Sequence, residues 1–189
     1  LGDVYKRQLL RNTLLYNILF IVLNIVIPVT LAVLINQIYS RIASKAYQTM
    51  MFFPYFMSWV VASYFLDAFL NQDNGLINSI MRNAGKEPIQ WYMSAGVWPF
   101  ILIFMYLWKS TGYNMVIYLS SISGIDTTLY EAAVMDGANK RQQVWHITLP
   151  CLKSVIIMMF ILNVGKVFYS DFGLFFQLSQ GASGSIFKT

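Results

Sequence analysis

The sequence predicts an all-α, polytopic membrane protein that crosses the bilayer four times. Of its 189 residues, 57% are hydrophobic and only 11% are charged, whereas soluble domains are usually about 45–50% apolar and about 25% charged. The mean hydropathy is +0.55. The apolar residues gather in four long runs, and a helix needs roughly 20 such residues to cross a bilayer core. A soluble helical bundle is disfavoured, because the remaining polar segments are too few to cover it.

The four apolar runs define the predicted spans in chain order. The first extends over about Thr13–Ile38 and contains Pro28. A proline frees a carbonyl and kinks a helix, which a membrane bundle tolerates where neighbouring groups satisfy the backbone. The other spans extend over about Tyr47–Leu70, Val97–Leu119 and Ser154–Leu178. All four are apolar around most of their circumference and lack the three-and-four spacing of a soluble amphipathic helix.

Three loops connect these spans and set their orientation. The first loop, Ser40–Ala46, and the third, Ser120–Lys153, carry five Lys and Arg residues between them, while the second, Asn71–Gly96, carries two. Because cytoplasmic loops hold the excess of Lys and Arg, the first and third loops are predicted to be cytoplasmic. At the outer interface we expect a belt of aromatic side chains: Trp91, Tyr92 and Trp98.

The two ends of the sequence do not follow this pattern. Residues 1–8 are too polar for a signal peptide and have no apolar core, so we interpret them as a doubtful N-terminal end, outside a membrane domain at 9–189. Residues 181–189 are loop-like, and both ends look cut. Lys6, Arg7 and Arg11 would lie outside the membrane, which reduces the charge asymmetry described above.

No catalytic site, metal site or cofactor site is indicated. Cys151 is the only cysteine and His146 the only histidine, so the sequence offers neither a disulfide nor a metal-ligand set. The Lys and Arg residues behind the net charge of +5 are spread thinly, which disfavours nucleic-acid binding. A phosphate-binding glycine loop with lysine is also missing. Any ATP must therefore be bound by another chain.

The third loop is predicted to form two short helices around a glycine. Asp126, Thr127 or Thr128 can cap the first helix, and Thr128 with Glu131 three residues later has the form of a capping box. Alanine favours helix through this segment. Gly137 is expected to end the helix in the left-handed conformation that glycine adopts at helix C-termini.

The second short helix is predicted at Lys140–Thr148, with its end at Pro150, because a proline disfavours helix in the residue before it. The loop should face water, yet it carries several apolar side chains: Leu129, Tyr130, Met135, Val144 and Trp145. An amphipathic segment in such a place indicates that a partner supplies a groove.

The fixed positions of this loop resemble the EAA loop of the permeases of binding-protein-dependent ABC importers. They are Glu131-Ala132-Ala133, three residues, Gly137, nine residues, Ile147, one residue, and Leu149-Pro150. All positions and both spacings match, and the loop falls between two spans, as in that family. The resemblance extends from about residue 11 to the end. Further segments resemble sugar permeases of the oligosaccharide and polysaccharide type: residues 54–60, 74–78 and 108–114.

This resemblance implies a type I ABC importer transmembrane domain that lacks the first and last of about six spans. In the family the loop docks on a separate ABC ATPase, which binds the ATP. Carried over, Glu131 pairs with a basic group of the ATPase, and Ala132 and Ala133 permit close approach. Gly137 supplies the turn, and Leu149-Pro150 fix the return into the membrane.

The resemblance also implies the partners and the setting. The family uses two ATPase subunits, a second permease subunit that is identical or a sister, and an extracytoplasmic solute-binding protein. The chain would be a multi-pass protein of the bacterial cytoplasmic membrane, in contact with lipid, and would import a carbohydrate. The particular sugar does not follow from the sequence.

Ionisable residues inside the predicted spans have two interpretations, a pathway role or contacts at interfaces and between helices. Asp67 and Lys109 lie where their side chains can reach an interface. Lys166 and Asp171 are five positions apart and are not a direct helical pair. Sugars are held by polar groups and aromatic faces, and on this ground we hypothesise a translocation path along three residues of the fourth span: Asn163, Tyr169 and Asp171.

Two other classes of membrane protein are alternatives to the importer. A secondary transporter or channel needs broken spans or paired charges at mid-membrane. The prolines and scattered charges allow this reading, but it leaves the EAA loop unexplained. A membrane-embedded enzyme needs a cluster of acid, base, nucleophile or metal ligands, and no such cluster is present in the sequence. Dependence of transport on a separate ATPase distinguishes the importer from both.

Overall fold

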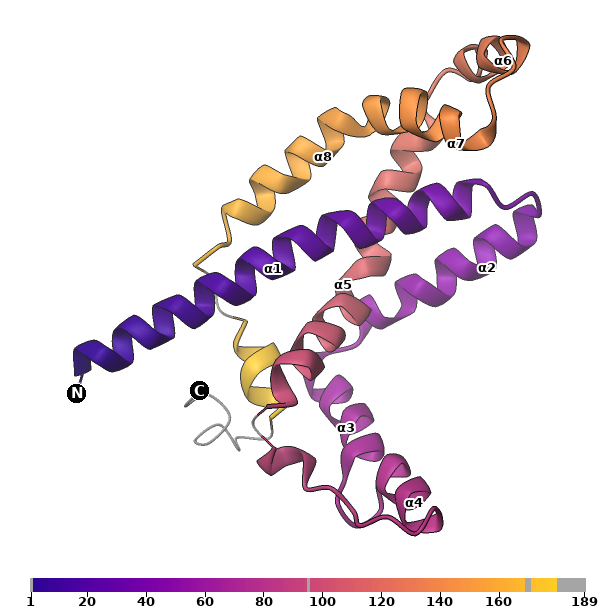
Figure 1. Ribbon diagram of the computed structural model, residues 1–189. Helices are drawn as coiled ribbons and strands as arrows, with labels where there is room; N and C mark the ends of the chain where they lie inside the picture. Colours follow the sequence, from indigo (N-terminus) through magenta and orange to yellow (C-terminus); the bar gives the residue numbers. More distant parts are fainter. Residues whose placement is uncertain (1, 95, 169–170, 180–189) are drawn as a thin grey trace. The chain divides into compact units, whose positions relative to one another are not determined.

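The structure, a computed structural model, describes residues 2–94, 96–168 and 171–179. Every regular element in these residues is helical (Figure 1), so the predicted all-α class is confirmed. The helices long and apolar enough to cross a membrane in this part of the chain are Leu10–Asn36, Trp98–Ser123 and Lys140–Val164. Arg41–Phe56 and Trp59–Leu70 add a fourth crossing if they form one broken span.

The elements follow one another with short connections. In chain order they are α1 (Gly2–Asn36), α2 (Arg41–Phe52), η1 (Phe53–Phe56), α3 (Trp59–Leu70), α4 (Leu76–Asn83), η2 (Trp91–Met93), α5 (Trp98–Ser123), α6 (Thr127–Met135), α7 (Lys140–Gln143), η3 (Val144–Thr148), α8 (Leu149–Val164) and η4 (Gly173–Gln177). Of these, η3 and η4 are π-helical turns, while η1 and η2 are 3₁₀ turns.

The described residues divide into two units. The first contains 2–55 and 107–168, and the second contains 56–94, 96–106 and 171–179. Helix α5 begins in the second unit and ends in the first.

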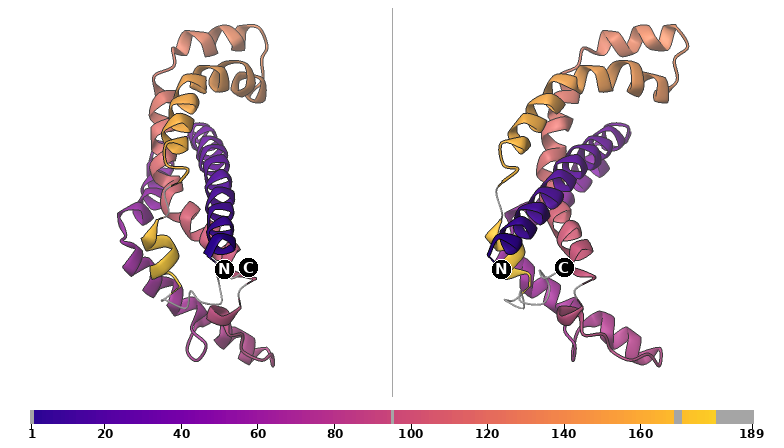
Figure 2. Two further views of the ribbon diagram at one scale, coloured as in Figure 1. Left: turned by 90° about the vertical axis from the view of Figure 1, so that its left-hand side faces the viewer. Right: turned by 60° about the vertical axis from the view of Figure 1, so that its left-hand side comes forward.

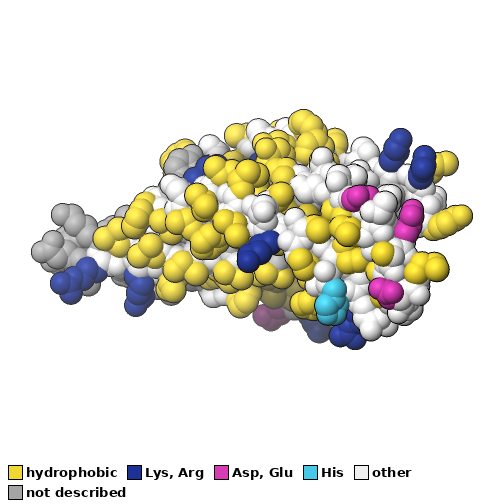
Figure 3. Space-filling model, turned by 90° about the horizontal axis from the view of Figure 1, so that it is seen from above, with side chains coloured by type: hydrophobic (Ala, Val, Ile, Leu, Met, Phe, Trp, Pro, Cys, Tyr) yellow, Lys and Arg dark blue, Asp and Glu magenta, His cyan; other side chains and the backbone are white. Residues whose placement is uncertain are grey.

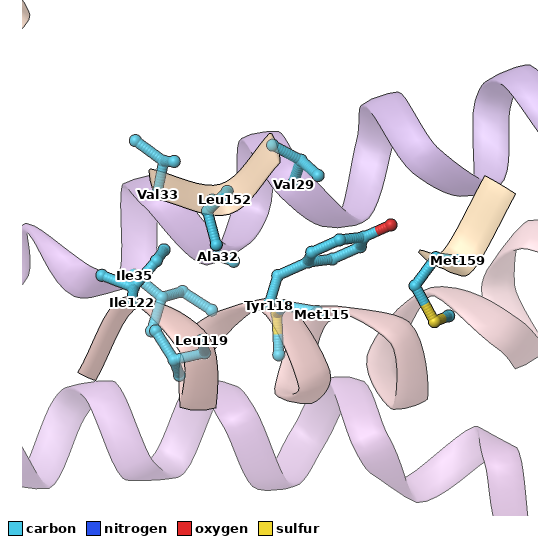
Figure 4. Close-up of a cluster of buried hydrophobic side chains, with 10 residues drawn as sticks. All are labelled: Val29, Ala32, Val33, Ile35, Met115, Tyr118, Leu119, Ile122, Leu152 and Met159. Carbon is cyan, nitrogen blue, oxygen red and sulfur yellow. The ribbon is translucent and has the colours of Figure 1, made fainter. Parts of the chain in front are cut away.

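The core of the first unit lies where α1, α5 and α8 meet. Figure 4 shows the buried side chains of α1 and α5 directed toward one another, with two from α8 joining them. The members are Val29, Ala32, Val33, Ile35, Met115, Tyr118, Leu119, Ile122, Leu152 and Met159. On each helix they recur about every three or four residues, which places them on one face. In a membrane such close packing, more than water exclusion, holds helices together.

A polar bridge also joins α1 to α5 in the first unit. Asn24 and Asn114 are buried, and the Asn114 Nδ2 donates to Asn24 Oδ1 at 2.8 Å. The Ser110 hydroxyl donates to the same oxygen at 2.9 Å. Amide and hydroxyl bonds of this kind hold membrane helices together, because the alternative is an unsatisfied polar group in hydrocarbon.

Helix α5 approaches α2 closely at Gly112. This residue is buried, and a Cβ built on it would overlap the backbone of Met51 and Phe52. Only glycine lets two helix backbones approach so closely. Beside this crossing, Tyr55 and Tyr113 stack with ring centroids 4.6 Å apart.

In the second unit, η4 packs against α3. The Trp59 Nε1 donates to Asp171 Oδ2 at 2.9 Å, and the other oxygen of Asp171 accepts the N–H of Gly173 at 2.9 Å. Gly173 lies against the Trp59 ring, where a Cβ would overlap it.

The helices differ from the predicted spans in two places. The run Tyr47–Leu70 is interrupted, because Ser58 caps a new helix by accepting the N–H of Val61. The helix in the fourth run starts at Leu149 and ends at Val164 instead of reaching Leu178. Gly165 is the C-cap. After it, the N–H groups of Lys166 and Val167 bond only three residues back, to Asn163 O and Val164 O, both at 3.0 Å, so the last turn tightens and the helix ends.

Smaller differences concern the first loop and the aromatic belt. The predicted loop Ser40–Ala46 is mostly helical, because Ser40 caps α2 by accepting the N–H of Ala43. Helix α1 begins at Gly2 and continues through Pro28. Trp98 does not belong to an exposed belt: it is fully buried, and its Nε1 donates to Trp91 O at 3.1 Å.

Candidate functional site

The predicted coupling loop contains α6, and Asp126 sets where this helix begins. The Asp126 side chain accepts the N–H of Thr128 at 3.0 Å, so Asp126 is the N-cap. Hydrogen bonds from the N–H and the hydroxyl of Thr128 hold the pKa of the Asp126 carboxyl below its ordinary value. The predicted capping box of Thr128 and Glu131 is wrong: the helix begins at Thr127, so Glu131 lies too far along it to reach back to the cap.

The end of α6 is the glycine turn that the sequence predicted. Gly137 has φ = 80°, and its N–H bonds to Val134 O at 3.0 Å. The N–H of Ala138 bonds to Ala133 O at 2.8 Å. These bonds satisfy carbonyls that a helix leaves open at its C-terminus. The left-handed conformation of Gly137 is therefore confirmed.

Helix α6 has an outer and an inner face. Glu131 and Ala132 are exposed, and Met135 exposes 87% of its surface. Tyr130 and Ala133 are half-buried on the inner side. At 100° per residue, Glu131 and Met135 lie on one side of the helix and Tyr130 and Ala133 on the other. The outer face thus offers a carboxylate next to a methyl-sized side chain and an apolar one, a combination that suits a partner's basic group beside an apolar surface.

A series of hydrogen bonds ties the inner face of α6 to the start of α8. The hydroxyls of Tyr130 and Thr148 are 2.9 Å apart, and Thr148 donates to Gln143 O at 3.5 Å. The Gln143 Nε2 donates to Ala138 O at 3.1 Å. Thr148 and Gln143 are buried. All three views show α6 beside the α7–α8 segment (Figures 1 and 2).

The segment after Gly137 forms one continuous helix. Asn139 and Gln142 make a reciprocal capping box at the start of α7. The following turn is π-helical, and the N–H of Leu149 bonds to Val144 O, five residues back. The predicted helix end at Pro150 is therefore wrong. Pro150 lies in the first turn of α8, where its missing N–H is tolerated, and the wide turn before it shifts the hydrogen-bond register.

The base of the loop is anchored in the core of the first unit. Ile125, Val144 and Leu149 pack against the buried cluster of α1, α5 and α8. Ile147 is half-buried and Pro150 is exposed. A displacement of α6 would therefore act directly on side chains packed among these three helices.

Beneath α6 lies a cavity of about 470 Å³ within the first unit. Its polar lining includes Asn36 from the end of α1, Tyr130 from α6, and Lys140 and Gln143 from α7. The loop is thus not tightly packed against the first unit between the Tyr130–Thr148 bond and the packed side chains of Ile125, Val144 and Leu149.

The residues proposed for a translocation path have different surroundings. Asn163 is half-buried in α8 and donates to Met159 O at 2.7 Å. Tyr169 lies outside the described residues. Asp171 belongs to the second unit, where it holds Trp59 and the start of η4. Lys109 donates to Tyr55 O at 2.8 Å and lies over the Tyr55 ring. In the described residues, His, Cys, Asp and Glu form no group that could hold a metal.

Comparison with known protein families matches residues 24–181 to the family described as "Binding-protein-dependent transport system inner membrane component". The chain belongs to this family. The family is one of transport components, which agrees with the expectation that the chain is not an enzyme. The description also agrees with a multi-spanning membrane protein.

Similar individual proteins include one named as a permease of a transport system. The Bacillus subtilis polygalacturonan/rhamnogalacturonan transport system permease protein YteP is 38% identical over 157 residues, covering 83% of this chain and 49% of that protein. Protein LplB of the same organism is 30% identical over 179 residues, covering 95% of this chain and 56% of the relative. The chain thus spans about half the length of the curated relatives that it matches.

A crystal structure of a bacterial ABC transporter involved in the import of the acidic polysaccharide alginate matches with a TM-score of 0.84 and 28% identity. The match covers 93% of this chain and 63% of that chain. A second crystal structure, of an alginate transporter in complex with an alginate pentasaccharide-bound periplasmic protein, matches with a TM-score of 0.82. The predicted fold, part of an ABC importer transmembrane domain, is confirmed.

The surface agrees with a membrane domain. On the face seen in Figure 3, hydrophobic side chains cover much of the surface, and Lys or Arg side chains also stand among them. Helix α1 has large exposed apolar side chains, among them Leu15, Val22 and Val26, each more than half exposed. In lipid such exposure carries no penalty, whereas charged groups belong near the interfaces.

Sequence reasoning found the loop and its glycine but missed the residues that fix its geometry. The sequence pattern predicts only an apolar role for Tyr130, and it predicts no role for the side chains of Thr148 and Gln143. Their pairing joins positions 18 apart across a turn. The sequence signal for this pairing is a polar residue, Thr148, directly before the apolar helix that begins at Leu149.

Proposed function

We propose that this chain is a permease subunit of an ATP-driven, binding-protein-dependent importer. It forms part of the translocation path and is coupled to a separate ATPase through the loop at 120–153. Membership in the family of binding-protein-dependent transport components supports the proposal. So does the likeness to the transmembrane part of an alginate ABC transporter.

The observation that carries the proposal is the construction of α6. Its outer face presents Glu131 and Ala132 to the solvent, while Tyr130 on its inner face is bonded to Thr148. A helix that is exposed on one side and anchored to the membrane core on the other transmits a push from a docked partner. Glu131 pairs with a basic group of the ATPase, and Gly137 keeps the turn that orients the helix.

The partners follow from this role. ATP is bound by two ABC ATPase subunits, so the chain itself needs no cofactor. A second permease subunit completes the path, and an extracytoplasmic solute-binding protein delivers the solute. The setting is the cytoplasmic membrane of a bacterium, with the coupling loop on the cytoplasmic side. No part of this role involves nucleic acid.

The solute is a carbohydrate of the oligosaccharide type. Support comes from relatives named for the transport of polygalacturonan and rhamnogalacturonan, of arabinooligosaccharides and of lactose. We keep Asn163, Tyr169 and Asp171 as the path hypothesis. If Asn163→Ala leaves the apparent affinity for the transported sugar unchanged, Asn163 does not line the path.

A secondary transporter or channel without an ATPase is the alternative. The family disfavours it, because its members are components of binding-protein-dependent systems. The alternative also gives no role to the exposed face of α6.

The experiment is a pull-down of the tagged native protein from its own membranes, followed by mass spectrometry. We expect an ABC ATPase to co-purify with the wild-type protein and to be lost from Glu131→Lys. Glu87→Lys is the matched control, because it makes the same charge reversal at an exposed position in the loop at 71–96. The Glu87→Lys protein should still co-purify with the ATPase. An intact wild-type protein that brings no ATPase in mild detergent would overturn the proposal in favour of the secondary transporter.

A further inference from the structure

Helix α4, in the loop between α3 and α5, exposes large apolar side chains while it buries the polar side chain of Asn78. Leu76 exposes 51% and Ile80 59% of their surfaces, whereas Asn78 between them is fully buried. Leu76 and Ile80 are four positions apart and therefore lie on the same face of the helix. Ile77 and Met81 extend this apolar face and are half-buried. In water this arrangement would be inverted, because a surface helix normally buries its apolar side.

The rotation of α4 is fixed by Asn78. Its Nδ2 donates to Ile89 O at 2.9 Å and to Gln72 O at 3.3 Å. Its Oδ1 accepts the N–H of Ile89 at 3.0 Å and the Nε1 of Trp91 at 3.1 Å. A buried amide with its donors and acceptor paired is costly to displace. The helix therefore cannot roll to bury Leu76 and Ile80 without breaking these bonds.

The loop also cannot carry α4 away from the bilayer. Five residues join Leu70 at the end of α3 to Leu76, and a residue extends by about 3.6 Å at most. Gly75 turns this connection tightly, because a Cβ there would overlap the Asn71 backbone. On the other side, the bond from Trp98 Nε1 to Trp91 O holds the loop against the first residue of the membrane helix α5.

We propose that α4 is an interfacial helix, with Leu76 and Ile80 immersed at the boundary between lipid headgroups and acyl chains. The occupant of this apolar face is lipid, because α4 begins six positions after the end of α3 and is tied through Trp91 to Trp98, the first residue of α5. A short helix with one apolar face and one polar face lies in the plane of the interface when its apolar side is in lipid. Met93, 75% exposed in the same loop, adds to the immersed surface.

Site-directed spin labelling tests the proposal in the native protein reconstituted into liposomes. Because Cys151 is the only cysteine in the sequence, a Cys151→Ser background allows single labels at Leu76→Cys and Ile80→Cys. Asn74→Cys and Glu87→Cys are the aqueous controls, since both side chains are exposed and polar. Phe104→Cys on α5, 63% exposed, is the lipid control. All five labels replace exposed side chains, so the fold should be retained, and size-exclusion profiles check it.

The readout is the ratio of collision rates with oxygen and with a water-soluble nickel chelate. We expect labels at Leu76 and Ile80 to give a ratio several-fold above that of the aqueous controls and below that of Phe104. Equal ratios at Leu76, Ile80 and Asn74 would overturn the proposal. Protection from nickel that appears only after a solute-binding protein is added would also overturn it, and would assign the face to that protein.

Discussion

Tyr130 and Thr148 show how a single pair of side chains decides what α6 can do. Their hydroxyls are 2.9 Å apart, and Thr148 is buried at the start of the helix that returns to the membrane. Without this bond, α6 would be joined to α8 only through the turn at Gly137 and the short α7. A displacement of Glu131 would then reach the core less effectively, through the packing of Ile125, Val144 and Leu149 alone.

The first prediction is that Tyr130→Phe weakens coupling without unfolding the chain. A typical hydrogen bond contributes about 1 kcal/mol net, which is small beside the stability of the anchored loop. We expect the stimulation of ATPase activity by the binding protein to fall, and uptake per ATP to fall with it, in reconstituted complexes. Thr148→Val should give the same defect, and the double variant should be no worse than either single variant.

The control for that prediction is Tyr39→Phe, which removes the hydroxyl of a fully exposed tyrosine near the same cavity. It should leave coupling unchanged. Additive losses in the double variant would contradict the prediction, because they would show that the two hydroxyls act independently.

Tyr118 presents the opposite case, a hydroxyl that the fold does not use. Its side chain is fully buried in the core of the first unit, and its oxygen has no hydrogen-bond partner in the part of the chain that the structure describes. An unsatisfied buried hydroxyl costs roughly 1–3 kcal/mol.

The second prediction is therefore that Tyr118→Phe leaves thermal stability unchanged or raises it, because the ring is kept and the buried hydroxyl is removed. The melting temperature of the detergent-purified protein measures this. Tyr118→Leu is a second variant, expected to lower the melting temperature through the cavity it leaves. A clear fall with Tyr118→Phe would show that the hydroxyl has a partner in the assembled protein.

For single residues, the sequence predicts those features that depend on local backbone conformation, such as the end of a helix. Gly137 could be recognised because a left-handed helix end needs glycine. The choice among Asp126, Thr127 and Thr128 as cap could not be made, since each of these side chains can accept an N–H two or three positions further along the chain. The pairing of Tyr130 with Thr148 could not be predicted either, because it depends on how the chain folds back after Gly137.

At the scale of elements, the apolar runs located membrane segments but not their breaks. A hydropathy pattern reports the average environment of a segment, and the segments on either side of Ser58 and Gly165 are mainly apolar. The interruption at Ser58 comes from one side-chain cap, and the end at Val164 comes from the turn at Gly165. Neither changes the composition of its window enough to be seen.

Gly112 gives the third prediction, on the packing of α5 against α2. A Cβ at this position would overlap the Met51 backbone, so Gly112→Ala must push two helices apart. Overpacking of this kind costs typically about 1–3 kcal/mol. We expect a lower melting temperature and a lower yield of folded protein after detergent extraction.

The matched control for Gly112 is Gly124→Ala at the end of the same helix. Gly124 is exposed, and a Cβ there would make only ordinary contacts, the nearest at 3.6 Å. This variant should behave like the wild-type protein. Equal stability of Gly112→Ala and Gly124→Ala would contradict the close approach of the two backbones.

At the scale of the whole molecule, the sequence carries a clearer signal for the proposed coupling loop than for the proposed path of the solute. The EAA positions all lie between residues 131 and 150, in a single anchored segment of the structure. The residues of the hypothesised path have no such local signature, because a path between helices takes its side chains from several spans. Asp171 illustrates the difficulty. Its position in an apolar run suggests a path residue, but in the structure its two carboxylate oxygens accept hydrogen bonds from Trp59 Nε1 and from the N–H of Gly173.

The last prediction concerns the sidedness of the loops, which decides whether α6 can meet a cytoplasmic ATPase. Labels on single cysteines replacing Lys45, Lys86 and Arg141, all exposed, can be read from each side of the membrane in a Cys151→Ser background. The excess of Lys and Arg in the first and third loops predicts that those loops are cytoplasmic. A membrane-impermeant maleimide should therefore react with Lys86→Cys in right-side-out vesicles, and with Lys45→Cys and Arg141→Cys only in inverted ones. Reaction of Arg141→Cys from the outside would place α6 away from any cytoplasmic ATPase, and reaction of Lys45 and Arg141 labels from opposite sides would mean that the segment between residues 47 and 119 does not cross the membrane twice.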